Sequence, residues 1–342
     1  MIVILKQGYR PENLEEVLSI AHEMGFQTHL SQGQEKTIVG IIGDDSYLSI
    51  DRFANLDFVE DVVKVLKPYK RVTRFFHPKP TVIPFPGFGS IGGGPFTVMA
   101  GPCAVESLEM LDEIGAFLKE EGVLFLRGGA FKPRTSPYSF SGLGKKGLEY
   151  LRQVADRYGF RVITEVMGLA ELQMVMDYAD ILQVGARNAQ NFRLLEALGN
   201  TQIPVFLKRG FMNTIQEFLQ SAEYILANGN QQVILCERGI RTFETATRNT
   251  LDISAVPVIK ESSHLPIFVD PSHASGKHEW VPSLAYAALA TGADGIMVEV
   301  HPHPARALSD GRQSLNFPQF HDMNSRIQQL QPLFASERNP QP

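Results

Sequence analysis

The sequence of 342 residues contains little cysteine, no long hydrophobic run and no excess of positive charge. Its two cysteines, Cys103 and Cys236, are too few for a disulfide framework. No apolar run approaches the roughly 18 residues of a membrane-spanning helix, so the sequence predicts no membrane span. The segment Met1–Leu5 lacks the basic region and long apolar stretch of a signal peptide, and we therefore expect a cytoplasmic protein.

The formal net charge of −5 argues against a general nucleic-acid binder, so any anion-binding site must be local. The glycines at 92–94 precede a predicted strand instead of following one, and they therefore do not make a dinucleotide-binding fingerprint. What the chain has in quantity is apolar residues, at 44%. That content supports a sizeable core, and the length allows two domains or one barrel with an appendage.

Residues 1–76 predict a small ferredoxin-like α+β domain. Its expected strands and helices, in the order strand, helix, strand, strand, helix, strand, are Ile2–Leu5, Pro11–Met24, Thr28–Leu30, Thr37–Ile42, Phe58–Leu66 and Arg71–Phe76. The second helix is predicted from the inward spacing of Val59, Val62 and Leu66. Residues 77–95 are rich in proline and glycine and predict a linker without regular structure.

From residue 96 to residue 335, short apolar runs alternate with amphipathic helical patterns. The expected strands are Thr97–Ala100, Leu124–Arg127, Val162–Glu165, Ile181–Val184, Val205–Lys208, Val233–Cys236, Ile267–Val269 and Gly295–Glu299. Eight strand–helix units in about 240 residues favour a (β/α)8 TIM barrel. A doubly wound open sheet shows the same alternation and is the alternative.

The stretch from Arg127 to Pro137, RGGAFKPRTSP, carries the strongest functional signal. It follows an apolar run, so it lies at the end of a predicted strand. Three cations and two hydroxyls on a loop rich in glycine and proline suit an anion site, because Arg offers a planar fork and Lys a point charge. A solvated surface loop is the alternative interpretation.

Cations also follow other predicted strands, at Arg187, Lys208 and Arg238. Reactive groups of a barrel gather at the carboxyl ends of its strands. Cations brought together there would repel one another without counter-anions. The pattern therefore predicts one or two substrates that carry several negative charges.

A second set at the strand ends consists of Cys103, His273, Glu299 and Asp310. One thiolate, one imidazole and two carboxylates suit a borderline divalent cation such as Mn²⁺, Fe²⁺, Co²⁺ or Zn²⁺. Alternatives stay open at this point, because Cys103 could be a small core residue, His273 a general base and Asp310 a loop cap. His301 is a lesser candidate for the same site, and Cys236, inside an apolar strand, is expected in the core.

Together these residues resemble the metal-dependent 3-deoxy-7-phosphoheptulonate (DAHP) synthases of the subgroup with an N-terminal ferredoxin-like regulatory domain. The matching motifs are Ala100–Cys103, Leu126–Pro137, Gly185–Asn188, Leu207–Gly210, Leu235–Gly239, Asp270–His273 and Val298–His301. The resemblance implies a transferase that condenses phosphoenolpyruvate with erythrose 4-phosphate and water, giving the seven-carbon keto-acid phosphate and phosphate. This reaction is the first step of the shikimate pathway to chorismate and the aromatic amino acids.

The resemblance also implies roles for individual residues. It assigns the metal to Cys103, His273, Glu299 and Asp310. It assigns phosphoenolpyruvate to Arg127, Lys132, Arg187, Lys208 and Arg238. It assigns erythrose 4-phosphate to Lys132, Pro133, Arg134, Thr135, Ser136 and Asp310. Lys132, Cys103 and His273 are the implied catalytic residues, and Lys132, within reach of both substrates, is a candidate proton donor to the aldehyde oxygen.

The resemblance further implies a homotetramer and feedback inhibition by tyrosine or phenylalanine through the N-terminal domain. A plain oligomerisation module is the alternative for that domain. The nearest rival activity is that of the related eight-carbon synthases, which use arabinose 5-phosphate and carry an Asn-Arg-Ser-Ser-like sequence where this chain has Pro133–Ser136. More distant alternatives are a Schiff-base aldolase through Lys132 or Lys208, and a non-catalytic amino-acid sensor.

Overall fold

The computed structural model describes residues 1–32, 36–42, 49–63, 69–132, 138 and 140–334. The chain divides into two compact units, Met1–Lys70 and Arg71–Pro342. The first is a small sheet with helices, and the second is a barrel preceded by a short hairpin. In the part of the chain that is described, no helix is both long enough and apolar enough to cross a membrane.

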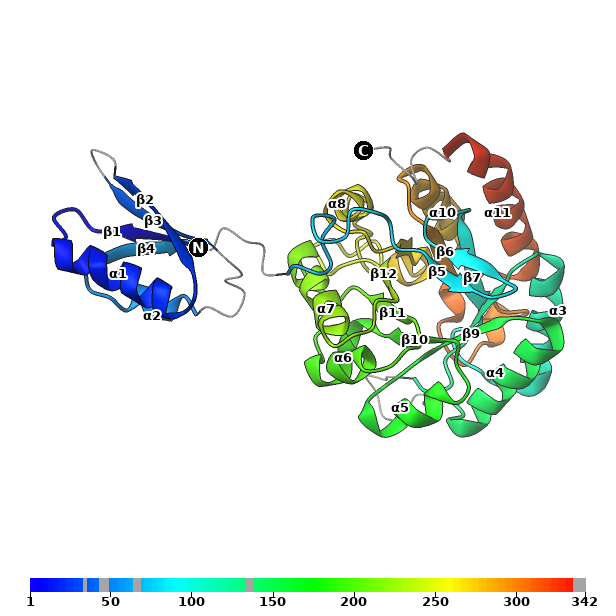
Figure 1. Cartoon of the computed structure of the whole chain (residues 1–342). Coiled ribbons are helices and arrows are strands. Elements are labelled where there is room, and N and C mark those ends of the chain that lie inside the picture. The colour runs from blue at the N-terminus through cyan, green and yellow to red at the C-terminus, as the bar shows by residue number, and fades with distance from the viewer. Residues whose placement is uncertain (33–35, 43–48, 64–68, 133–137, 139, 335–342) are drawn as a thin grey trace. The chain divides into compact units, whose positions relative to one another are not determined.

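The N-terminal unit is a four-stranded antiparallel sheet with two helices on one face (Figure 1). Its elements are β1(Ile2–Leu5), α1(Pro11–Glu23), β2(Gln27–Gln32), β3(Thr37–Ile42), α2(Asp51–Ala54) and β4(Val59–Val63). The strand order β2-β3-β1-β4 places β1 and β3 in the centre. Val3, Val17 and Phe53 are fully buried between sheet and helices. The expected ferredoxin-like domain is confirmed by this order of elements.

Two elements of this region differ from expectation. The predicted helix Phe58–Leu66 is wrong, because Val59–Val63 forms strand β4 beside β1. A register shift in that pairing lets Val59 and Val62 both be buried. In this bulged strand the buried residues are three apart, the spacing that is typical of a helix face. The predicted strand Arg71–Phe76 is also wrong, since its only ladder contact is an isolated bridge between Thr73 and Ser263.

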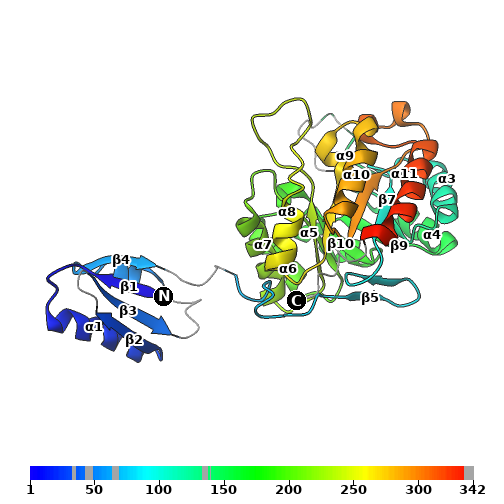
Figure 2. The ribbon, with the colours of Figure 1, turned by 90° about the horizontal axis from the view of Figure 1, so that it is seen from above.

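The expected irregular linker contains a hairpin, β5(Ile83–Phe85) and β6(Gly89–Ile91). Ile83, Phe85 and Ile91 are buried in the same core cluster as side chains from the eight barrel strands. Arg161, the first residue of strand β9, donates to the Pro86 carbonyl. The hairpin therefore closes the amino-terminal end of the barrel, and Figure 2 shows it beneath the strands. Proline is tolerated here because a two-stranded hairpin consists only of edge strands.

The barrel is closed and its neighbouring strands are parallel, in the order β10-β11-β12-β13-β14-β7-β8-β9. Its strands are β7(Thr97–Gly101), β8(Phe125–Arg127), β9(Arg161–Glu165), β10(Ile181–Val184), β11(Val205–Lys208), β12(Val233–Glu237), β13(Ile267–Val269) and β14(Gly295–Glu299). These runs are apolar because parallel strands covered by helices are buried on both faces. The predicted (β/α)8 barrel is confirmed, and the open sheet is excluded by the β14–β7 pairing.

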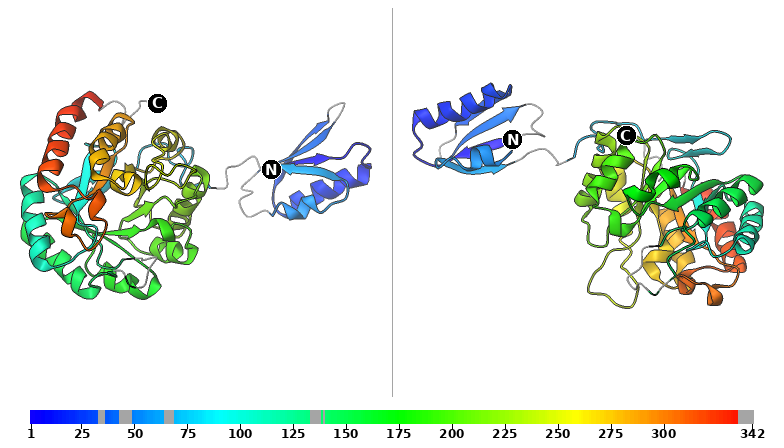
Figure 3. Two further views of the ribbon diagram at one scale, coloured as in Figure 1. Left: turned by 180° about the vertical axis from the view of Figure 1, so that it is seen from behind. Right: turned by 90° about the horizontal axis from the view of Figure 1, so that it is seen from below.

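Helices surround the barrel as an outer ring (Figure 3). They are α3(Leu108–Glu120), α4(Lys145–Tyr158), α5(Leu169–Met176), α6(Phe192–Gly199), α7(Ile215–Ala227), α8(Ala255–Ser262), α10(Val281–Ala290) and α11(Phe317–Leu330). Several begin at side-chain caps; Thr214 and Glu217, for example, form a capping box at the start of α7. This scaffold fixes the strand ends, where the polar residues of the next section lie.

Candidate active site

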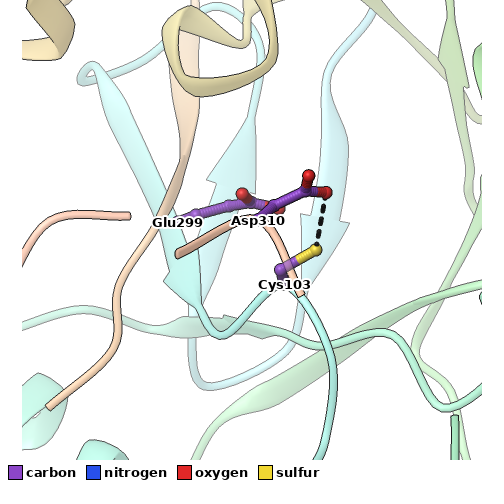
Figure 4. A group of neighbouring side chains, drawn as sticks. All are labelled: Cys103, Glu299 and Asp310. Carbon is purple, nitrogen blue, oxygen red and sulfur yellow. Dashed lines mark hydrogen bonds between the residues drawn. The ribbon is translucent and has the colours of Figure 1, made fainter. Parts of the chain in front are cut away.

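Three of the four predicted metal donors meet at the carboxyl ends of adjacent strands. Cys103 follows β7, Glu299 ends β14, and Asp310 lies on the loop beyond it. The β7–β14 register pairs Glu299 with Gly101, which brings the first two side chains together. Donor atoms of Cys103, Glu299 and Asp310 all lie within 4.8 Å of one another (Figure 4).

The electrostatics of this cluster suit a cation. Burial and the Glu299 carboxylate raise the pKa of the Cys103 thiol to about 12. Its Sγ donates to Asp310 Oδ2 at 3.2 Å. Burial acts to raise the pKa of Asp310. The Arg248 guanidinium and other neighbouring groups act more strongly in the opposite direction, so the pKa of Asp310 is lowered to about 2. A divalent cation would take the place of the thiol proton, because a thiolate is the ligand form of cysteine.

His273, the fourth predicted donor, adjoins the cluster. It lies on the short helix α9(Pro271–Ser275), with Nε2 3.4 Å from Glu299 Oε1 and Nδ1 2.7 Å from Asp270 Oδ2. Burial lowers the pKa of His273, which favours the neutral ring. With Nδ1–H donating to Asp270, the lone pair of Nε2 faces Glu299. This is how a metal-ligating imidazole is oriented, so the four residues fit a divalent cation.

Predicted anion-binding residues line the same end of the barrel. Arg127 is buried and donates to the Pro102 carbonyl at 2.7 Å and to Glu299 Oε1 at 3.0 Å. Its Nε is buried without a hydrogen-bond partner among the described residues. Lys208 is also buried and donates to Asp270 Oδ2 at 2.5 Å. Unsatisfied donor capacity at the barrel end suits an anionic ligand.

Three guanidinium groups surround the ring of Phe211. The distances from Cζ to the ring centroid are 5.4 Å for Arg187, 4.7 Å for Arg238 and 4.7 Å for Arg241. Burial lowers the pKa of Arg238 to about 10, and this guanidinium donates to the carbonyl oxygens of Gly239 and His273. A cluster of like charges held over an aromatic face would suit a phosphate or a carboxylate.

Lys132 lies beside the metal cluster. Its Nζ donates to the Cys103 carbonyl at 3.0 Å and to Cys103 Sγ at 3.1 Å. The close packing needs glycine at 129, where a Cβ would lie 2.8 Å from the Cys103 carbonyl oxygen. The predicted erythrose 4-phosphate residues Pro133, Arg134, Thr135 and Ser136 lie outside the described residues.

Sequence reasoning missed several residues of this site. Phe211, Arg241 and Arg248 lie on loops beyond the strand ends, and Gln313 ends the short 3-10 helix Gly311–Gln313. Phe211 and Gln313 also carry no charge that could mark them in the sequence. Their role emerges only from contacts across the barrel end. Two lesser expectations have clearer outcomes. His301 is buried, with Nε2 3.6 Å from a Glu106 oxygen, outside the three-donor cluster. Cys236 belongs to the barrel core, as predicted.

Comparison with known proteins gives consistent matches along the chain. The DAHP synthetase I family profile matches residues 85–336, and the DAHP synthase ferredoxin-like domain matches residues 1–67. The chain is 60% identical over 330 residues to phospho-2-dehydro-3-deoxyheptonate aldolase of Thermotoga maritima, covering 96% of this chain and 97% of that protein. It is 31% identical over 265 residues to 2-dehydro-3-deoxyphosphooctonate aldolase of Francisella philomiragia, covering 72% and 94% respectively.

Solved structures agree with these matches. The crystal structure of the Thermotoga maritima phospho-2-dehydro-3-deoxyheptonate aldolase (DAHP synthase) superposes with a TM-score of 0.90 at 59% identity, covering 97% of both chains. A truncated form of the Thermotoga maritima 3-deoxy-D-arabino-heptulosonate 7-phosphate synthase superposes with a TM-score of 0.72 at 58% identity, covering 77% of this chain and 96% of that one.

Proposed function

We propose that this chain, which belongs to the DAHP synthetase I family, condenses phosphoenolpyruvate with erythrose 4-phosphate and water to give DAHP and phosphate. The reaction is the first step of the shikimate pathway. The observation that carries the proposal is the meeting of Cys103, Glu299 and Asp310 beside Lys132, at a barrel end where cations follow several strands. A metal site and cations for two multiply charged anions in one place are what this condensation needs.

Phosphoenolpyruvate carries a carboxylate and a phosphate, which matches the two groups of cations. We assign the buried Arg127 and Lys208 to its inner end, and Arg187 and Arg238 beside Phe211 to its phosphate. The fixed positions of these cations orient C3 of phosphoenolpyruvate toward the aldehyde. Holding two anionic substrates in reacting geometry itself supplies a large part of the rate.

Cys103, His273, Glu299 and Asp310 would hold one divalent cation, of Mn, Fe, Co or Zn, which acts when bound as a Lewis acid on the aldehyde carbonyl. Lys132 would donate a proton to the aldehyde oxygen as C3 attacks. Burial acts to lower the pKa of Lys132, but the neighbouring Cys103 and other charges raise it, so the ammonium form is kept. Water then adds at C2, and phosphate leaves with cleavage of the C–O bond.

We assign the second substrate to Pro133–Ser136 together with Lys132 and Asp310. Arg134 supplies a phosphate fork, and Thr135 and Ser136 supply hydroxyl donors. The Lys-Pro-Arg-Thr sequence favours erythrose 4-phosphate over arabinose 5-phosphate. The identities of 60% to the seven-carbon enzyme of Thermotoga maritima and 31% to an eight-carbon enzyme support the same choice.

The test is phosphate release from phosphoenolpyruvate with each aldose phosphate, before and after treatment with a chelator. We expect release with erythrose 4-phosphate, none after chelation, and recovery with Mn²⁺ or Co²⁺. Preference for arabinose 5-phosphate would place the chain with the eight-carbon enzymes. Activity that resists chelation, with substrate trapped on the protein by borohydride, would indicate a Schiff-base aldolase, and no release at all would leave the non-catalytic sensor.

We also propose that the N-terminal domain, expected over residues 1–76, mediates feedback inhibition by tyrosine or phenylalanine in a homotetramer. The match of residues 1–67 to the DAHP synthase ferredoxin-like domain supports it. A chain beginning at Arg71 is the best truncation, because the backbone N–H groups of Arg71 and Val72 donate to Glu223 of the barrel. It should stay active and lose inhibition; retained inhibition would contradict the assignment, and a change in assembly alone would leave an oligomerisation module.

A further inference from the structure

Three of the donor side chains in the metal cluster each have a cationic side chain beside them. The three pairs are Cys103 Sγ with Lys132 Nζ at 3.1 Å, Glu299 Oε1 with Arg127 Nη1 at 3.0 Å, and Asp310 Oδ1 with Arg248 Nη1 at 3.1 Å. Lys132 and Arg127 already have substrate roles in the proposed function. Arg248 has none, and no motif singled it out, so its contacts require a separate explanation.

Arg248 connects two carboxylates of the cluster. Its Nη1 donates to Asp310 Oδ1 and, at 2.6 Å, to Gln313 Oε1. Gln313 is only 2% exposed, and its Nε2 donates to Glu299 Oε2 at 2.7 Å. A continuous chain of hydrogen bonds therefore runs from Asp310 through Arg248 and Gln313 to Glu299.

The backbone of Arg248 is itself fixed to the helix that carries His273. Its N–H donates to the Ser275 carbonyl at 3.2 Å, and Asn249 Nδ2 donates to the His273 carbonyl at 3.0 Å. Through these bonds the β12–α8 loop holds one side of the metal cluster. Arg248 therefore contacts Asp310 directly and Glu299 through Gln313, and its loop also binds the helix that carries His273.

Asp310 needs such support more than the other donors do. It lies on a loop and not in a strand, and its φ of 52° is the only positive value of a non-glycine residue in the described chain. A left-handed backbone is uncommon at a residue other than glycine, and it persists when its surroundings hold it. Arg248 provides a charged hydrogen bond at this point.

We propose that Arg248 is a positioning residue that holds Asp310 and Glu299 at the separation a divalent cation requires, and so sets the affinity for the metal. The proposal rests on the metal site of the proposed function but not on its substrates. A purely electrostatic role makes the opposite prediction, because a neighbouring positive charge repels a cation and its removal would tighten binding.

The test is Co²⁺ binding to the full-length, metal-freed protein. Affinity is measured by competition with a chromophoric chelator, and the thiolate-to-cobalt absorption band reports the coordination of Cys103. Arg248→Met should weaken binding about 10- to 100-fold, as outer partners of metal ligands commonly do. Arg248→Lys keeps the charge but not the planar fork, so it should also weaken binding, by a smaller factor. Arg312→Met, which removes an exposed guanidinium two residues from Asp310, should leave binding unchanged.

A second test measures Co²⁺ binding by Gln313→Leu, alone and combined with Arg248→Met. If Arg248 and Gln313 act as one connection, the double variant should lose less affinity than the product of the two single losses. Unchanged or tighter Co²⁺ binding by Arg248→Met, or fully multiplicative losses, would overturn the proposal. Circular dichroism checks folding, and Arg248→Lys alone carries the comparison if the methionine variant does not fold. Because no substrate is used, failure here is distinguishable from failure of the proposed reaction.

Discussion

The barrel and the N-terminal unit place their polar residues by different rules. The barrel strands are buried on both faces, so the charged side chains in them lie at the strand ends, and more charges follow in the loops. In the N-terminal unit only one face of the sheet is covered, and exposed polar residues are spread along strands such as β2. Charge position therefore indicates function in the barrel and carries little information in the smaller unit.

The two units also have separate cores. One cluster joins the β5–β6 hairpin to the barrel strands, and the other joins Val3, Val17 and Phe53 of the N-terminal unit. Each unit therefore buries its own apolar surface, as a domain does. Damage to one core should spare the other, and damage to the site should spare both.

The largest effect should come from the barrel site. Glu299→Ala removes a candidate ligand and leaves Arg127 buried without its carboxylate, so turnover should fall about 10³-fold or more, since a bound metal contributes several kcal/mol. The matched change in the other unit is Glu60→Ala, which breaks the exposed pair with Lys36 and should leave turnover within about 2-fold. Steady-state phosphate release measures both, and a loss under tenfold for Glu299→Ala would place the chemistry elsewhere.

The next effect tests the independence of the cores. Phe53 is fully buried in the N-terminal unit, so Phe53→Ala should destabilise that unit by about 3 kcal/mol. Urea unfolding followed by hydrogen exchange should show the loss in residues 1–63, with barrel protection and uninhibited turnover unchanged. Leu30→Ala, at a position that is 39% exposed, is the control. A parallel loss of protection in the barrel would show that the units unfold together.

A smaller effect concerns the aromatic ring beneath the guanidinium groups. Phe211→Leu keeps an apolar side chain but removes three cation–π contacts, each contributing roughly 0.5–1 kcal/mol. We expect the KM for phosphoenolpyruvate to rise about 5- to 10-fold with little change in kcat. Phe243→Leu, at a 98% exposed position on a nearby loop, is the control. An equal change of KM in both variants would show that Phe211 has no special role in binding phosphoenolpyruvate.

The smallest effect is a pH dependence of barrel stability. The hydrogen bond and charge of Glu121 raise the pKa of His321 above its usual value near 6.5. Because the pKa of His321 is higher in the folded state, protonation stabilises the folded protein. This contribution is complete below the unfolded pKa near 6.5 and disappears as the pH rises through the folded pKa. The Tm of the wild type should therefore exceed that of His321→Gln near pH 6, and the difference should vanish toward pH 8. A difference that does not vary with pH would assign the effect to packing.

Much of the barrel could be predicted because its signals are local. Apolar runs such as Ile181–Val184 and Val205–Lys208 are buried strands with the expected bounds, and the charges that follow them mark the site. The helix predicted over Phe58–Leu66 was wrong for a tertiary reason. Val59 and Val62 are three residues apart, as on one face of a helix. A bulge in the β1–β4 pairing, which no local pattern encodes, lets both be buried in a strand.

The ligand motifs were visible in the sequence, but the support around them was not. Arg248 and Gln313 lie far apart in the chain and meet only when the β12–α8 loop packs beside the loop after β14. The hairpin was missed because proline and glycine, which dominate residues 77–95, are typical of irregular segments. Its three buried apolar residues, Ile83, Phe85 and Ile91, gain their partners only from the closed barrel.

The hairpin at the closed end of the barrel has a consequence for synthesis of the protein. Ile91 leaves the ribosome about 200 residues before Met297, yet both belong to one core cluster. At typical translation rates that interval lasts roughly 10–40 s, during which the apolar side of the hairpin has no barrel to cover it. The apolar side of the hairpin therefore stays exposed in the nascent chain until the last barrel strand is made. We expect the chain to depend most on chaperones during this interval.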